Sequence, residues 1–184
     1  MPRLDKPRVD PVAIDDFDEA QREIMKPFVA QGRTFNVFTT MVNHPDLFRR
    51  WLVFANHILL KSTLGTRDRE ILILRIGHLA DCEYEWRQHV QIARDADMTD
   101  AEIRAVREGA GAPCWSENER ALINATDELK HDTHLSDAAW AALAAHYDTR
   151  QIMDIVFTVG QYNMLAMALN SLGVQADDGL PDTP

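Results

Sequence analysis

The chain has 184 residues, of which 46% are hydrophobic, and it carries a formal net charge of −10. This length and composition exclude a disordered or fibrous chain and indicate one globular domain with a substantial core. The acidic balance, without a basic cluster, argues against nucleic acid as a partner. We find no signal-peptide pattern and no apolar run of about 20 residues, so we expect a cytoplasmic protein that does not engage a membrane.

Apolar residues recur with the period of an α-helix along most of the chain, and no stretch alternates with the period of a strand. We therefore expect an all-α fold, a multi-helix bundle. Thr99 and Ser116 each open a capping box, and Gly173 is typical of the residue after a helix. Helices are expected at residues 17–30, 46–61, 67–80, 82–96, 99–107, 116–130, 137–146 and 149–172, with a short apolar piece at 37–41.

The two ends of the chain lack this helical period. Residues 1–14 are rich in proline and charge, which predicts an extended N-terminal arm, and residues 175–184 are expected to form a flexible tail. The single domain then spans residues 15–174. Asp15 or Asp16 is expected to cap the first helix, and Pro27 to bend or end it.

The stretch 67–80 is apolar over most of its circumference, which places it at the centre of the bundle. The run TRDREILILRIG, residues 66–77, resembles TRQIMDIVFTVG, residues 149–160, with Met153 in the place of Glu70. The similarity is consistent with an internal duplication of helical hairpins. Chance similarity between two apolar helices explains it almost as well.

The most informative stretch spans this central helix and the next one. At 3.6 residues per turn, Cys82, Glu85 and His89 fall within a sector of about 60° on one helix face, which continues as an apolar face. Glu70 lies among apolar residues of the preceding helix. Buried ionisable groups are candidates for acid–base chemistry. The alternative is that Glu85 and His89 form an ordinary i,i+4 pair at a subunit contact.

Cys82 and Cys114 are the only cysteines, and they are far apart in the sequence. The chain has no CxxC pair and no set of Cys and His residues with zinc spacing, so we expect no metal site. Cys82 is either a small buried hydrophobic residue or, at a helix start, a thiol with a lowered pKa.

These residues also carry a family resemblance. The acid within RDREILILR, the following CEYEWRQH and the closing GQYNMLAMALNSLGV resemble the carboxymuconolactone decarboxylase and alkylhydroperoxidase D-like superfamily. The resemblance covers roughly residues 35–174, and it is closer to the decarboxylase-like branch, which lacks the CxxC pair. It implies a helical homo-oligomer, such as a dimer, trimer or hexamer, with its active site between helices.

In the alkylhydroperoxidase D branch, a glutamate precedes a C-x-x-C-x-x-x-H motif whose two cysteines cycle between dithiol and disulfide. Glu70 matches that glutamate, Cys82 the first cysteine and His89 the histidine. The second cysteine, which attacks the peroxide in that branch, is replaced by Glu85. A disulfide cycle within the motif is therefore impossible here, although a peroxidase that uses Cys82 alone remains an alternative.

In the decarboxylase branch, a glutamate stands four residues before the histidine, as Glu85 and His89 do. The resemblance then implies cofactor-free acid–base chemistry on a small carboxylated lactone or oxoacid, with His89 delivering a proton, Glu85 orienting it and Glu70 holding the network. Tyr84 stands where either branch has a histidine. The substrate-binding candidates are Tyr84, Trp86, Tyr162 and Arg75, of which Arg75 either holds a carboxylate or forms a structural ion pair.

Three functions from different classes therefore stand at this stage. The first is a cofactor-free lyase or isomerase for a small molecule that uses Glu70, Glu85 and His89. The second is a thiol peroxidase or antioxidant protein that uses Cys82. The third is a helical oligomer without activity, in which the polar cluster is only an interface network.

Overall fold

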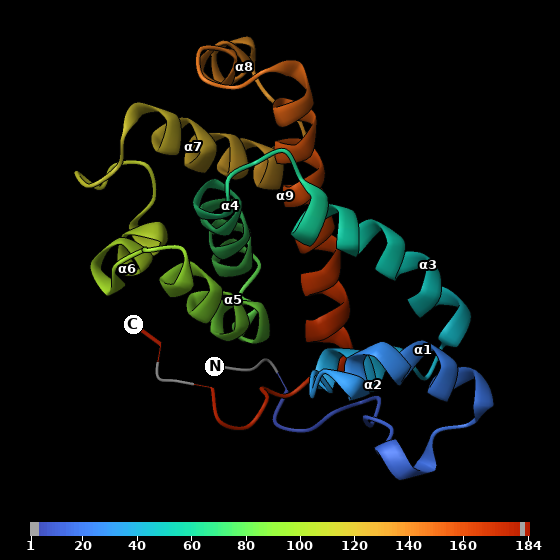
Figure 1. Ribbon diagram of the computed structural model, residues 1–184. Coiled ribbons are helices and arrows are strands. Elements are labelled where there is room, and N and C mark those ends of the chain that lie inside the picture. Colours follow the sequence, from blue (N-terminus) through green and yellow to red (C-terminus); the bar gives the residue numbers. More distant parts are fainter. Residues whose placement is uncertain (1–3, 181–182) are drawn as a thin grey trace.

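The computed structural model describes residues 4–180 and 183–184, and every regular element in these residues is a helix (Figure 1). The expected all-α fold is confirmed. Residues 1–3 and 181–182, at the ends of the expected arm and tail, lie outside the described residues. The α-helices are α1 (Glu19–Ala30), α2 (Asn36–Met41), α3 (Pro45–Asn56), α4 (Thr66–Leu79), α5 (Glu83–Asp95), α6 (Asp100–Glu108), α7 (Glu117–His131), α8 (Asp137–Ala144) and α9 (Thr149–Leu172).

The start of α1 differs from the expectation. Asp15 and Asp16 belong to a short 3₁₀ turn, Ile14–Asp16, and the helix is capped by Asp18 instead. The Asp18 carboxylate accepts the backbone N–H of Gln21 at 2.8 Å, and the Gln21 side chain accepts the backbone N–H of Asp18. This reciprocal capping box fixes the first turn. The helix continues through Pro27, which removes a single backbone donor.

Helix α3 ends in a wider turn than the sequence predicted. The segment His57–Lys61 is a π-helix, and it is anchored from α9 by the carboxylate of Asp154. That carboxylate accepts the backbone N–H of Thr63 at 2.6 Å and lies 3.0 Å from Nε2 of His57. A π-helical turn inserted into an α-helix often marks a functional site, and this one faces the cavity described below.

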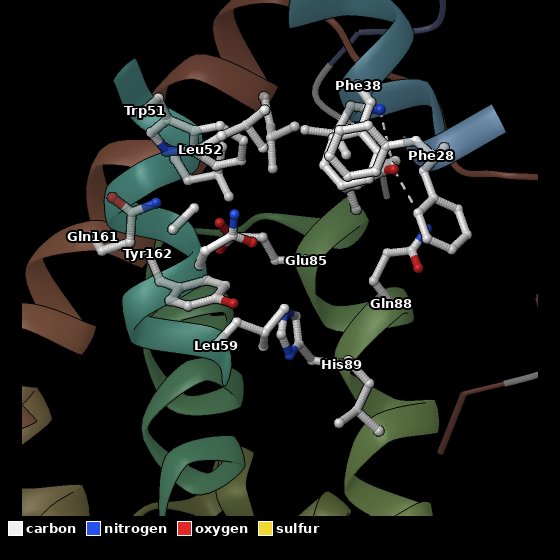
Figure 2. A pocket seen from close by; sticks show the side chains of 18 residues that line it. Phe28, Phe38, Trp51, Leu52, Leu59, Glu85, Gln88, His89, Gln161 and Tyr162 are labelled. Carbon is white, nitrogen blue, oxygen red and sulfur yellow. Dashed lines mark hydrogen bonds between the residues drawn. The ribbon is translucent and has the colours of Figure 1, made fainter. Parts of the chain in front are cut away.

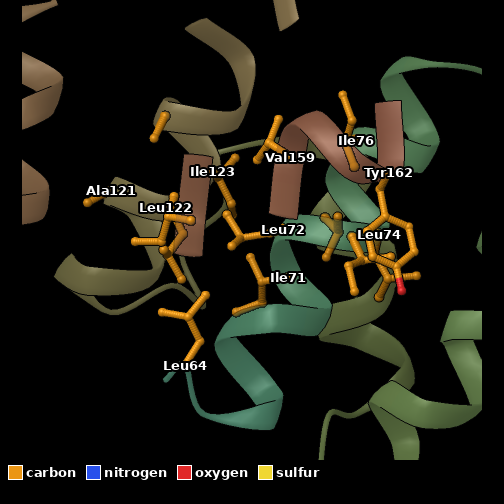
Figure 3. Close-up of a cluster of buried hydrophobic side chains, with 14 of the residues drawn as sticks. Leu64, Ile71, Leu72, Leu74, Ile76, Ala121, Leu122, Ile123, Val159 and Tyr162 are labelled. Atoms are coloured by element: carbon orange, nitrogen blue, oxygen red, sulfur yellow. The ribbon is translucent and has the colours of Figure 1, made fainter. Parts of the chain in front are cut away.

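Helix α4 occupies the centre of the larger core, as its sequence predicts. All nine residues from 69 to 77 are buried, and the helix packs against α5, α7 and α9. Figure 3 shows Ile71 and Leu72 of α4 beside Ile123 of α7 and Val159 of α9. Replacing one of these fully buried aliphatic side chains with alanine is expected to cost about 2–5 kcal/mol.

A smaller aromatic cluster fixes α1, α2 and α3 to one another. The ring centroids of Phe28 and Phe38 are 4.5 Å apart, and Phe48 stacks on Trp51 at 6.0 Å. Figure 1 shows these three helices, in blue and teal, on one side of the long helix α9. The cavity of the protein lies where this cluster meets α5 and α9.

The two ends of the chain meet at the end of α9. The backbone N–H of Arg8 donates to the carbonyl of Leu172 at 2.8 Å, so the expected N-terminal arm is extended and lies against the protein's own last helix. The expected flexible tail begins with bonded residues, because the Asp177 carboxylate accepts the backbone N–H of Asn36 at 2.7 Å and the hydroxyl of Tyr84 at 2.6 Å. Gly173 ends α9 in the left-handed conformation, with φ of 73°, as predicted.

By length and apolar composition, α9 could cross a membrane, which the sequence reading did not anticipate. Half of its most apolar window is buried inside the fold. The core helix of a globular protein passes the same test, so this feature is weak evidence for a membrane span.

Candidate active site

A hydrogen-bonded pair between α4 and α5 forms the base of the site. Nδ1 of His89 lies 2.6 Å from Oε2 of Glu70, whose side chain is fully buried. Because a carboxylate only accepts, Nδ1 carries the proton of this bond, and Nε2 is the ring nitrogen that can act on a ligand. Nε of Arg69 donates to the other carboxylate oxygen at 3.2 Å. Glu70 therefore fixes the orientation and tautomer of His89.

Glu85 lies one helical turn before His89 on α5 and is only 2% exposed. Neither of its carboxyl oxygens has a hydrogen-bond partner within the described chain. Burial raises the pKa of this carboxyl well above its ordinary value. Burial therefore favours the protonated, neutral form of this carboxyl, which can donate its proton or accept a hydrogen bond.

Tyr162 of α9 completes this part of the site. Its ring meets the His89 imidazole edge-on, with centroids 4.9 Å apart and planes at 88°. Burial raises the pKa of the Tyr162 hydroxyl well above its ordinary value. The hydroxyl therefore remains a neutral donor at physiological pH.

These groups line a cavity of about 160 Å³ (Figure 2). Its walls come from α1, α2, α3, the π-helical turn, α5 and α9, and they are mostly apolar and aromatic. None of the described residues that line it is a lysine or an arginine. The lining includes Phe28, Phe38, Trp51, Leu52, Leu59, Tyr84, Glu85, Gln88, His89, Gln161 and Tyr162.

The cavity thus brings together four of the residues singled out in the sequence, Glu85, His89, Tyr84 and Tyr162, with Glu70 directly behind His89. The Tyr84 hydroxyl is already bonded within the protein, since it donates to Asp177 and accepts the backbone N–H of Val37 at 3.2 Å.

Arg75 does not line this cavity. Its guanidinium forms a two-pronged ion pair with Asp127 at 2.6 and 2.9 Å and donates to the backbone carbonyls of Val106 and Arg107. Of the two roles expected for Arg75, the geometry therefore shows the structural ion pair. An arginine committed to these acceptors has no donor aimed at the cavity.

Trp86 and Cys82 also lie outside the cavity. The guanidinium carbon of Arg107 stands 4.0 Å above the Trp86 ring, and both side chains line a separate hollow. Cys82 is the N-cap of α5, 2% exposed, and it borders the same hollow as Trp86 and Arg107. The helical period placed Cys82 on the face of Glu85, but the cap residue has an extended backbone, which moves its side chain off that face.

Trp51 and Gln161 line the cavity, although the sequence did not single out either as a ligand-binding residue. Trp51 follows the apolar period of α3, which is typical of a packing residue. Gln161 is a buried amide, 3% exposed, in the long and largely apolar helix α9. A lone polar side chain on the inward face of such a helix is the signal that could have identified it.

Metal binding has no structural support in the part of the chain that is described. No group of three or more His, Cys, Asp or Glu side chains in these residues could hold a metal ion.

The chain is similar to a known family in sequence and to several solved structures in fold. Residues 45–128 match the model of the carboxymuconolactone decarboxylase family. No curated protein sequence matches the chain significantly.

Three solved structures show the shared fold. The alkylhydroperoxidase AhpD core protein from Ralstonia eutropha JMP134, an uncharacterised peroxidase-related protein, is 20% identical, with a TM-score of 0.82 over 95% of this chain and 94% of that one. A peroxidase-related protein from Silicibacter sp. TM1040 is 17% identical, with a TM-score of 0.79 over 98% and 94%. The debrominase Bmp8 is 18% identical, with a TM-score of 0.76 over 92% of each chain.

Proposed function

Because the protein belongs, through residues 45–128, to the carboxymuconolactone decarboxylase family, we propose that it is an enzyme that moves protons on a small organic substrate. The observation that carries this proposal is the Glu85 carboxyl, which is buried and unbonded in the same cavity as His89. A buried acid and an oriented imidazole that line one cavity give two groups able to transfer protons, which is the usual arrangement for acid–base catalysis.

The proposed step is a proton transfer next to a carbonyl group. Nε2 of His89 takes a proton from the carbon, and the electron pair of that C–H bond moves onto the carbonyl oxygen. Glu85 donates a proton to this oxygen, and Glu70 stabilises the imidazolium that has formed. In a substrate with a C=C bond β,γ to the carbonyl, His89 returns the proton to the γ carbon while the double bond moves into conjugation with the carbonyl and Glu85 recovers its proton from the oxygen, which completes an isomerisation.

The decarboxylation expected from the resemblance fits the cavity less well than this isomerisation. Loss of carbon dioxide requires a bound carboxylate, and a carboxylate is usually held by a cation. The candidate for that role, Arg75, is bonded to Asp127 and does not line the cavity, and none of the described lining residues is an arginine or a lysine.

Deuterium exchange from D₂O into small cyclic ketones, lactones and β-oxoacids, followed by NMR, tests the proposal. We expect exchange that falls about 100-fold or more in both His89→Gln and Glu85→Gln, the usual contribution of an acid–base group. His78→Gln is the matched control, because His78 is on the outer surface of α4 and away from the cavity. Exchange that is equal in His89→Gln and in the wild type would contradict the proposal.

A thiol peroxidase that uses Cys82 is the second candidate function. Its position as N-cap of a 13-residue helix favours it, since the helix dipole stabilises a thiolate. Its burial at 2% exposure disfavours attack on a peroxide. Consumption of hydrogen peroxide or an organic peroxide that disappears in Cys82→Ser but persists in His89→Gln would establish this candidate and overturn the first.

We also propose that the protein assembles with copies of itself and acts in the cytoplasm. Large apolar side chains are exposed along α3 and α9, including Val53 at 74%, Phe157 at 53% and Met167 at 59%. Exposed apolar residues on neighbouring helices are typical of a subunit contact. Light scattering on the wild type and on Phe157→Ser measures the mass of the assembly, and a monomeric wild type would contradict this proposal.

A further inference from the structure

The size of the cavity limits what can bind in it. Its volume of about 160 Å³ is close to that of an engineered cavity of about 150 Å³ that holds one benzene molecule. The rings of Phe28, Phe38 and Trp51 and the aliphatic chains of Leu52 and Leu59 surround this space (Figure 2). A single ring therefore fits inside these walls.

The polar atoms of the lining indicate which kind of ring. Nε1 of Trp51, Oε1 of Gln161 and both carboxyl oxygens of Glu85 are buried and lack a hydrogen-bond partner in the described residues. A buried polar group without a hydrogen-bond partner destabilises the fold, so three such side chains in one cavity are unfavourable unless a ligand pairs with them. In Figure 2, Trp51 and Gln161 lie on one side of the view, with Glu85 between them and Gln88.

The charge of the surroundings determines the charge of the ligand. The described residues that line the cavity include no lysine or arginine, and its acids are Glu85 and, behind His89, Glu70. An anion would lose its hydration without gaining a cation in return, except for the imidazole of His89. An uncharged ligand loses far less hydration on entering the same space.

We propose that the cavity binds an uncharged, single-ring molecule that carries both a hydrogen-bond acceptor and a donor, such as a hydroxyl group, on its edge. The indole N–H of Trp51 donates to the ligand, and the amide oxygen of Gln161 accepts from it. This inference rests on the proposed function in identifying the cavity as the substrate site, and it excludes carboxylated lactones as substrates.

Calorimetric titration with three probes of one ring size tests the proposal. Phenol is uncharged and has a hydroxyl group, toluene is uncharged and has no polar group, and benzoate carries a carboxylate. At pH 7.5 we expect phenol to bind at least about 10-fold more tightly than either of the others. Benzoate that binds as tightly as phenol would overturn the assigned charge, toluene that does so would overturn the polar edge, and no binding of any probe would overturn the ring site.

Two variants test the residues that form the polar edge. Trp51→Phe and Gln161→Leu remove the polar atoms and keep most of the volume, so we expect each to weaken phenol binding about 5- to 10-fold and to leave toluene binding unchanged. Trp140→Phe is the matched control, because Trp140 is 47% exposed on α8 and away from the cavity. Equal loss of phenol and toluene binding in a variant that unfolds at the wild-type temperature would contradict the assignment.

The two proposals fail in different ways. Selective phenol binding in a protein whose deuterium exchange is insensitive to His89→Gln would contradict the catalytic function alone. Exchange that depends on His89 and prefers carboxylated substrates would contradict the ligand class alone.

Discussion

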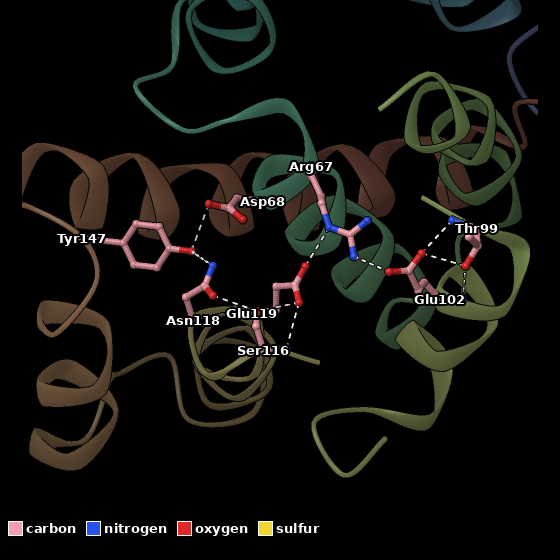
Figure 4. A network of polar contacts seen from close by, with 8 residues as sticks. All are labelled: Arg67, Asp68, Thr99, Glu102, Ser116, Asn118, Glu119 and Tyr147. Carbon is pink, nitrogen blue, oxygen red and sulfur yellow. Dashed lines mark hydrogen bonds and ion pairs between the residues drawn. The ribbon is translucent and has the colours of Figure 1, made fainter. Parts of the chain in front are cut away.

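Two polar regions border the central helix α4, and they differ in how their side chains are paired. At its N-terminal end, Arg67 bonds Glu119 at 2.7 Å and also bonds Glu102, while Asp68 accepts the hydroxyl of Tyr147 at 3.0 Å (Figure 4). In the cavity, Glu85 has no partner among the described residues. A network whose groups are all paired stabilises the fold, whereas an unpaired buried group indicates a ligand.

The same contrast appears in the proton affinities of two glutamates. Burial acts to raise the pKa of Glu102, but hydrogen bonds from Thr99 and Arg67 outweigh it and lower the pKa to about 2. Burial of Glu85 has no such compensation, so its pKa rises. One sequence thus contains a glutamate whose pKa is lowered and another whose pKa is raised, and partners account for the difference.

The largest expected effect concerns a paired arginine. Arg75→Met removes the ion pair with Asp127 and the donors to two backbone carbonyls, so we expect a loss of about 3 kcal/mol in the free energy of unfolding. Phenol affinity should not change. Arg87→Met is the control, expected to stay within about 0.5 kcal/mol of wild type in chemical denaturation. An Arg75→Met protein that keeps wild-type stability but loses phenol binding would contradict this prediction and indicate that Arg75 contributes to the site.

The unpaired Glu85 should make the folded protein less stable as the pH rises. Because the folded protein keeps the proton of Glu85 and the unfolded chain releases it above pH of about 4.3, wild-type stability should fall with rising pH by about 1.4 kcal/mol per pH unit. The decline should end at the folded pKa. Glu85→Gln lacks this decline, so denaturation from pH 4 to pH 8 should show a widening advantage for the variant. A constant gap would mean that Glu85 is ionised in the folded protein.

A smaller effect is expected for the paired glutamate, in acid. The lowered pKa of Glu102 stabilises the folded protein above pH of about 4.3, and this contribution is lost as the pH falls towards 2. We expect Glu102→Gln to cost about 1 kcal/mol at pH 7, because solvent screens a partly exposed ion pair. The gap should close by pH 2, and a gap that persists there would contradict the ion-pair explanation.

The helices and the spacing of Glu85 and His89 were predictable because each follows from local sequence, whereas Glu70, 19 residues before His89, was assigned to the same site by the family resemblance. Helical period and capping residues depend on neighbours within one turn, and His89 lies one turn after Glu85. The commitment of Arg75 to Asp127 was left open, because it depends on how α4 packs against α7. The suggested duplication also pairs Glu70, which is fully buried, with Met153, which is 54% exposed, so similar runs occupy different environments.

The protonation state of Glu85 tests the central claim most directly. Infrared difference spectra between wild type and Glu85→Gln isolate the signal of this one carboxyl group. We expect a protonated carboxyl band at pH 7 that shifts when phenol binds, because the ligand supplies the hydrogen bond that the folded protein lacks. A carboxylate band at pH 7 that phenol leaves unchanged would contradict both the neutral acid and its place in the site.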